Sequence, residues 1–179
     1  GAVLSVKARS RGRSFAIQIQ DPRLDPARFD ALVVPEHDPV RGANVVLTTG
    51  SLNAIAGLDL AAEAKRLEDQ IGLLPASRVL VSVGGPTRRQ QVEPELADRF
   101  VADLNKLAGQ GCGLMMTASR RTPDRLVRAL RELADASPAV LLWNGEGENP
   151  YFGYLGAADA IVVTSDSVNM TSEACSTGK

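Results

Sequence analysis

The chain has 179 residues, with 20 Lys and Arg against 21 Asp and Glu, so its net charge is -1 with the single His neutral. Hydrophobic residues make up 44% of the sequence and charged residues 23%, values that are ordinary for globular proteins and exclude a disordered chain. The lack of a basic excess excludes a general nucleic-acid binder, and no apolar run approaches the roughly 18 residues of a membrane span.

The first third of the chain contains three short apolar runs, 15–20, 31–34 and 45–49. Turns rich in Pro, Arg and Asp separate them, and no full helix fits between them. We therefore expect residues 1–57 to be the C-terminal part of a first Rossmann-like domain and a connector.

The rest of the chain alternates strand-like and helical segments. The predicted strands are 79–83, 114–117, 140–143 and 160–164, and the predicted helices are 60–71, 94–107, 123–134, 151–157 and one starting near residue 171. Several strands lack polar alternation, which is typical of strands buried on both faces. This order predicts an α/β fold, in which residues 58–179 form a second, nucleotide-binding Rossmann-like domain with a parallel sheet and helices on both faces. We expect that domain to be truncated at its C-terminus.

Ligands of such sheets bind beyond the carboxyl ends of the strands, where this chain concentrates glycines, hydroxyls and arginines. The predicted nucleotide-binding residues are Gly84, Gly85, Thr87, Arg88, Ser119, Arg120, Asn144, Gly145, Ser165, Asp166, Ser167, Ser172 and Glu173. Glycine N–H groups and helix N-termini favour anions, and the guanidinium fork suits a diphosphate. Glu173 can accept hydrogen bonds from two ribose hydroxyls.

Each of these features also has a purely structural interpretation. A Gly-Gly pair after a strand is commonly a tight turn, and this one is neither a G-x-G-x-x-G fingerprint nor a Walker loop. Arginine pairs in loops are often solvated, and a Glu in a first helical turn favours the helix dipole whatever its function.

Four other sets of residues are weaker candidates. His37 lies between two carboxylates and is a general base or a hydrogen-bonded turn residue. Trp143 ends a strand, where it stacks on a base or caps the core. Cys175, near a helix start, is an activated thiol or, as we expect, a small buried cysteine. Glu146 and Glu148 are an acid–base pair or a polar loop. Cys112 and Cys175 form no C-x-x-C pair, so we expect no disulfide framework and no metal site.

Several motifs in order resemble the mitochondrial-fission Elongated Mitochondria family, which has bacterial members, some labelled nucleoside-diphosphate-sugar epimerases. The motifs are QIQDPR at 18–23, VVPEHD at 33–38, SRRTP at 119–123, GEGENPY at 145–151 and AIVVTSDS at 160–167, followed by TGK at 177–179. The match extends over nearly the whole chain.

This family in turn is similar to GT-B glycosyltransferases, whose second domain holds most of a donor nucleotide. The stretch 158–174 together with Gly178 is similar to the donor-binding segment of the transferase that makes the lipid-linked peptidoglycan precursor. The resemblance implies that Glu173 holds the ribose and that Gly84 and Gly85 form the glycine loop. The chain departs from that pattern at Asn169 and Met170, which replace the usual glycines.

Three functions remain open at this point. The first is a GT-B-like protein that binds a nucleotide-diphospho-sugar and transfers the sugar without a metal or other cofactor. The second, implied by the eukaryotic family members, is a non-catalytic adaptor that recruits a protein partner. The third, an epimerase, is less well supported because neither Tyr151 nor Tyr154 has a Lys four residues later. The sequence assigns no catalytic residue, sugar, base, acceptor or oligomeric state, and it favours a cytoplasmic location.

Overall fold

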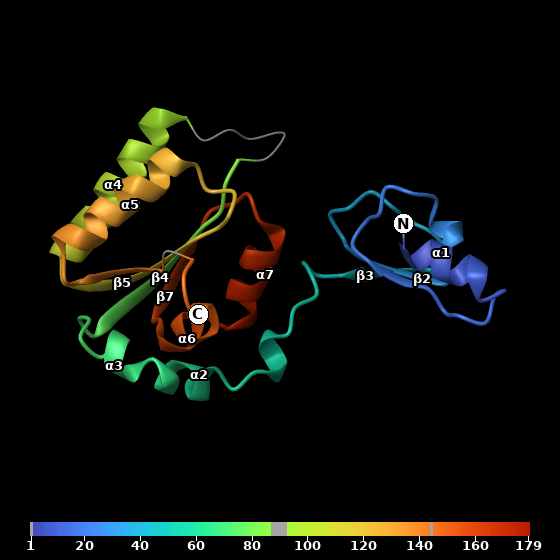
Figure 1. Ribbon diagram of the computed structural model, residues 1–179, viewed down its shortest axis with the longest axis horizontal. Helices are drawn as coiled ribbons and strands as arrows, with labels where there is room; N and C mark the ends of the chain where they lie inside the picture. Colours follow the sequence, from blue (N-terminus) through green and yellow to red (C-terminus); the bar gives the residue numbers. More distant parts are fainter. Residues whose placement is uncertain (1, 87–92, 144) are drawn as a thin grey trace. The chain divides into compact units, whose positions relative to one another are not determined.

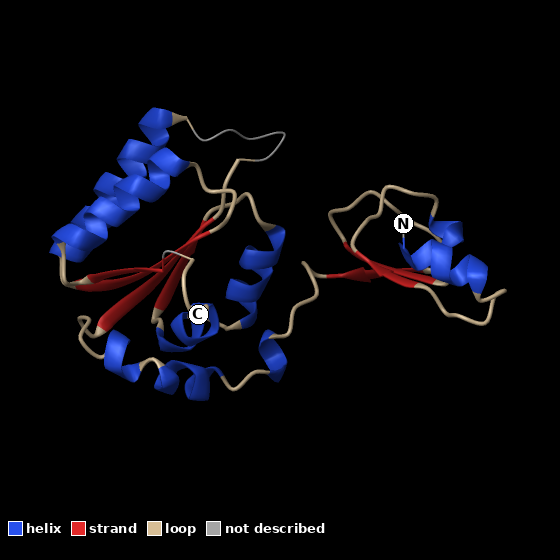
Figure 2. Ribbon diagram, viewed as in Figure 1, coloured by secondary structure: helices blue, strands red, loops and turns tan. Residues whose placement is uncertain are grey.

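The computed structural model describes residues 2–86, 93–143 and 145–179. The chain divides into two compact units, Gly1–Asn53 and Ala54–Lys179. Each unit contains a parallel sheet and helices (Figure 1, Figure 2), which confirms the predicted α/β class.

The first unit has a three-stranded parallel sheet in the order β1-β2-β3. It consists of β1 (Ile17–Ile19), β2 (Ala31–Pro35) and β3 (Val45–Thr48), with a single 3-10 turn, η1 (Pro26–Arg28), between the first two strands. The three predicted strands are confirmed. The helix α1 (Ala2–Arg9) was not predicted, because no apolar stripe marks it and none of its described residues is buried.

One carboxylate links α1 to the sheet of the first unit. Asp30 lies directly before β2, accepts a hydrogen bond from the Ala16 N–H at 2.7 Å and forms an ion pair with Lys7 of α1 at 2.8 Å. The N–H of Ala16, and then the ammonium group of Lys7, hold the pKa of Asp30 below its usual value.

The second unit has a four-stranded sheet in the order β6-β5-β4-β7. Its strands are β4 (Ser77–Val83), β5 (Cys112–Ala118), β6 (Val140–Trp143) and β7 (Ala160–Val163), and all paired neighbours are parallel. The four predicted strands are confirmed, with β4 and β5 each starting two residues earlier than expected. The carboxyl ends of all four strands therefore lie at one edge of the sheet.

Helices cover both faces of this sheet (Figure 1). One face carries α4 (Pro94–Gly109) and α5 (Asp124–Ala136), and the other carries α2 (Leu60–Arg66), α3 (Glu68–Ile71) and α6 (Tyr151–Ala157), with η2 (Ile55–Gly57) leading into α2. The last helix, α7 (Val168–Ser176), follows β7. The single helix predicted over 60–71 is wrong in detail, because the chain leaves helical geometry at Leu67, where ψ is 8°.

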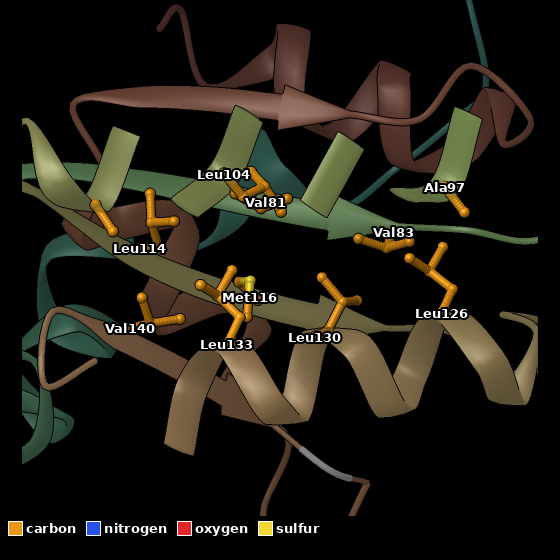
Figure 3. Close-up of a cluster of buried hydrophobic side chains, with 11 residues drawn as sticks. Val81, Val83, Ala97, Leu104, Leu114, Met116, Leu126, Leu130, Leu133 and Val140 are labelled. Atoms are coloured by element: carbon orange, nitrogen blue, oxygen red, sulfur yellow. The ribbon is translucent and has the colours of Figure 1, made fainter. Parts of the chain in front are cut away.

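Alternating strand residues build a core on each face. Figure 3 shows Val81, Val83 and Met116 facing Leu126, Leu130 and Leu133 of α5. On the opposite face, Leu80 and Met115 pack with Tyr154 and Leu155 of α6. This two-sided burial is what the uninterrupted apolar runs predicted.

The helices α2 and α6 meet through their backbones. A Cβ atom at Gly156 would overlap the carbonyl oxygen of Leu60, and one at Gly153 would lie 2.9 Å from the carbonyl oxygen of Glu63. Glycine is therefore required at this crossing, because any side chain would push α6 away from α2. The position of α6 matters because its first residue, Tyr151, reaches the site described next.

Candidate functional site

A hollow of about 590 Å³ opens at the carboxyl ends of β4, β5 and β6, a size in the range of small-molecule sites. Its lining residues are Ser82, Val83, Thr117, Ala118, Ser119, Arg120, Val127, Trp143, Gly145, Asn149, Tyr151 and Met170. Ser82 and Thr117 are buried polar residues near the ends of apolar strands, with hydroxyl oxygens 3.4 Å apart. These hydroxyls give the hollow a polar edge in an otherwise apolar sheet.

Arg120 and Trp143 contribute a cation and a ring to the hollow. The guanidinium of Arg120 forms neither an ion pair nor a hydrogen bond with any residue that the structure describes, so its donors are free for a ligand. The indole of Trp143 donates its N–H to the Glu146 carbonyl oxygen at 2.9 Å, which fixes the ring beside its own loop. Trp143 is half-buried and lines the hollow.

Tyr151 and Glu173 bring α6 and α7 together beside the hollow. The Tyr151 hydroxyl oxygen is buried and, among residues 2–86, 93–143 and 145–179, has no hydrogen-bond partner of good geometry. Burial first, and then the charge of the nearby Glu173 carboxylate, raise the pKa of Tyr151 above its ordinary range. Both causes favour the protonated hydroxyl of Tyr151, which can donate a hydrogen bond.

Thr122 joins the turns that follow β4 and β5. Its buried hydroxyl oxygen lies 2.6 Å from the Gly84 carbonyl oxygen and accepts the Ser119 N–H at 3.0 Å. The turn that carries Ser119 and Arg120 is thereby held against the glycine turn.

A second, smaller hollow of about 220 Å³ lies where β4 and β7 end. Gly84, Gly85, Ser165 and Asp166 line it together with apolar side chains of α4 and α5. The Asp166 carboxylate accepts hydrogen bonds from the Gly85 N–H at 3.0 Å and the Thr164 hydroxyl at 2.6 Å. The Gly84 N–H donates to Thr164 Oγ1 at 2.7 Å. Both glycine N–H groups, which we expected to face a phosphate, are therefore hydrogen-bonded within the chain.

Seven of the predicted site residues line one of the two hollows, whereas Ser167, Ser172 and Glu173 line neither. Ser119, Arg120 and Gly145 line the larger one, and Gly84, Gly85, Ser165 and Asp166 line the smaller one. Ser167 accepts the Met170 N–H at 3.4 Å as the N-cap of α7, which also contains Ser172 and Glu173. Thr87, Arg88 and Asn144 lie outside the described residues.

Two of the weaker candidates line neither hollow. His37 is in an exposed turn of the first unit, with Nε2 4.0 Å from the Asp38 carboxylate. Cys175 is exposed on α7, so the expectation that it is buried is wrong. Ala174 is the residue of α7 that is buried, and Cys175, the next residue along the helix, points to a different side.

Sequence reasoning missed Ser82, Thr117, Asn149, Tyr151 and Met170 as lining residues. A signal for the first two was present, since each is a polar residue at the penultimate position of an apolar strand. No comparable signal marks Met170 or Tyr151, because their positions depend on how α6 and α7 pack.

Comparisons with known proteins cover the whole chain. The model of a protein family described as mitochondrial fission ELM1 matches residues 1–179. The chain belongs to this family. It is 34% identical over 200 residues to the mitochondrial fission protein ELM1 of Arabidopsis thaliana, an alignment that covers 98% of this chain and 46% of that protein. It is also 25% identical over 196 residues to an uncharacterized protein of Rickettsia prowazekii (strain Madrid E), covering 91% of this chain and 55% of that protein.

Two further facts bear on this member of the ELM1 family. The chain spans about half the length of the curated relatives it matches. Every helix in the part of the chain that the structure describes is too short or too polar to cross a membrane.

Proposed function

We propose that this chain contributes the nucleotide-binding part of a GT-B-like glycosyltransferase that uses a nucleoside-diphospho-sugar without a metal ion. The observation that carries the proposal is the free guanidinium of Arg120 in a hollow of about 590 Å³ with hydroxyl groups at its edge. The resemblance of residues 158–174 to a donor-binding segment supports the same ligand class.

The residues around the hollow suggest how such a ligand would bind. Arg120 and Ser119 would hold the diphosphate, Trp143 would stack on the base, and Glu173 would accept from the ribose. A guanidinium beside the bridging phosphates would stabilise the departing diphosphate, which is the role a metal ion has in other transferases. The proposal assigns no residue as the base that would activate the acceptor.

Titration calorimetry of the full-length protein with UDP- and GDP-sugars tests this proposal. Loss of a charged hydrogen bond costs about 1.5–3 kcal/mol, so Arg120→Ala should weaken binding by roughly 10- to 100-fold. Arg128→Ala removes the same charge from the exposed side of α5 and should leave the affinity unchanged. No binding at millimolar ligand, or equal affinities for Arg120→Ala and the parent protein, would contradict the proposal and favour the adaptor function.

The only tryptophan of the sequence gives an independent readout. Because Trp143 lines the hollow, bound ligand should change its fluorescence with the same midpoint as the calorimetric titration. Trp143→Phe should abolish this signal and, if the ring stacks on the base, should also weaken binding. Calorimetric binding with no response from Trp143 would place the ligand elsewhere.

A further inference from the structure

The crevice between β4 and β7 is the point where the strand order of the second unit reverses. Successive strands are added outward from β4 through β5 to β6, whereas β7 pairs with the opposite edge of β4. In doubly wound sheets, this reversal is where ligands usually bind. The residue that occupies it here is Asp166, which lies in the turn after β7.

Asp166 is surrounded by hydrogen-bond donors from three turns. Its Oδ2 accepts from the Gly85 N–H at 3.0 Å and lies 3.3 Å from Nη2 of Arg121, while its Oδ1 accepts from the Thr164 hydroxyl at 2.6 Å. The side chain is only 9% exposed. A backbone N–H, a hydroxyl and a guanidinium together are the donor set with which proteins bind phosphate oxygens.

The backbone of the glycine turn is shaped around this carboxylate. A Cβ atom at Gly84 would overlap the carboxylate oxygens of Asp166, and one at Gly85 would overlap the Arg121 carbonyl oxygen. The contacts with Asp166 and Arg121 therefore account for glycine at both positions, and a bound ligand is not needed as the reason.

We propose that Asp166 determines the specificity of this edge by occupying the anion position of the crevice with its own carboxylate. A second anion there would displace Asp166 from its donors or lie beside its negative charge, and both are unfavourable. A ligand diphosphate is therefore directed away from the glycine turn and into the larger hollow, beside Arg120 at the end of β5. The choice of diphosphate as ligand rests on the function proposed above, but the exclusion of anions from the crevice does not.

Removing the carboxylate should convert the crevice into an anion site. In Asp166→Ala, the Gly85 N–H, the Thr164 hydroxyl and the Arg121 guanidinium lose their shared acceptor but keep their places on three turns. Inorganic pyrophosphate should then bind at least tenfold more tightly than to the parent protein. Asp166→Asn, which keeps the size of the side chain but removes its charge, should shift affinity in the same direction by a smaller factor.

The experiment is calorimetric titration of the full-length protein with inorganic pyrophosphate, with thermal melts to verify folding. Asp98→Ala is the matched control, because Asp98 also pairs with an arginine, Arg125 at 2.7 Å, but lies outside the crevice. It should bind pyrophosphate as the parent protein does. If Asp166→Ala or Asp166→Asn is folded and binds pyrophosphate no more tightly than the Asp98→Ala control, the proposal is overturned.

The parent protein provides a test that needs no variant. With glycine labelled by ¹⁵N, pyrophosphate or a nucleotide sugar should shift the amide signal of Gly145, which lines the larger hollow, more than those of Gly84 and Gly85, whose N–H groups are bonded within the chain. Larger shifts at Gly84 and Gly85 than at Gly145 would overturn the proposal even if the variants do not fold. Tight binding of pyrophosphate to Asp166→Ala without any binding of nucleotide sugars to the parent protein would instead refute only the proposed function.

Discussion

At the scale of single residues, the glycines of this chain differ in what they do. Gly156 has the Leu60 carbonyl oxygen where its Cβ would be, whereas Gly109, the last residue of α4, has no atom within 4 Å of that position. Both are helical, so their helix propensities are equal and only the packing distinguishes them. The same residue type is therefore essential at one position and replaceable at the other.

Substitution of these two glycines by alanine should have opposite effects. Gly156→Ala should lower the free energy of unfolding by about 1–3 kcal/mol, because α6 must move away from α2. Gly109→Ala should leave it unchanged or raise it by up to about 1 kcal/mol, since alanine favours the helix. Urea unfolding of the two variants measures the difference, and equal effects would mean that the helices do not meet as described.

At the scale of elements, the turns after β4, β5 and β7 form one bonded assembly. Thr122 joins the first two through Gly84 and Ser119, and Asp166 joins the first to the third through Gly85 and Thr164. The larger hollow lies beside this assembly, so its shape depends on the hydroxyl groups of Thr122 and Thr164, neither of which lines it.

Thr122→Val tests how far these turns depend on one hydroxyl. Valine keeps the shape but removes the donor to the Gly84 carbonyl oxygen, which should cost about 1–3 kcal/mol of unfolding free energy. The Ser119 N–H loses one of its two acceptors and keeps the Val83 carbonyl oxygen at 2.9 Å. Thr122→Ser keeps the hydroxyl and should retain most of the stability. A Thr122→Val variant that is as stable as the parent protein in urea unfolding would show that the hydroxyl does not hold the two turns together.

Elements with a strong local pattern could be predicted from the sequence, and those that depend on packing could not. Strands such as Val140–Trp143 are uninterrupted apolar runs, and Leu126, Leu130 and Leu133 mark α5 by helical spacing. The sequence predicts a start of α7 near Thr171, three residues too late, because Ser167 and Thr171 are both residue types that cap helices and the spacing does not choose between them. At the site, the turn residues Ser119 and Arg120 were predicted, but Tyr151 was not, since its place follows from the contact between α2 and α6.

At the scale of the whole molecule, the two units have separate sources of stability. The second has two apolar cores, whereas the first relies in part on Asp30, which holds α1 through Lys7 and accepts the N–H of Ala16. A carboxyl group whose pKa is lowered by folding contributes stability above its unfolded value of 3.8, and this contribution is lost as the pH falls through the folded value.

The acid response of the first unit should therefore depend on Asp30. Asp30→Asn should melt at a lower temperature than the parent protein at pH 6, and the difference should shrink as the pH falls below 3.8 and the parent carboxylate becomes protonated as well. Thermal melts followed by far-UV circular dichroism at several pH values measure this. A difference that stays constant with pH would show that the charge of Asp30 is not the cause.

The contact between Lys179 and the end of α6 has a mechanical consequence for the site. Its ammonium group donates to the carbonyl oxygens of Leu155 and Gly156 at 2.7 and 2.8 Å, three residues beyond the end of α7. Tyr151 and Met170, at the opposite ends of these two helices, both line the larger hollow. Because these two hydrogen bonds link the C-terminal ends of α6 and α7, Lys179→Met should weaken the packing between the two helices and so loosen a wall of the hollow from its far side.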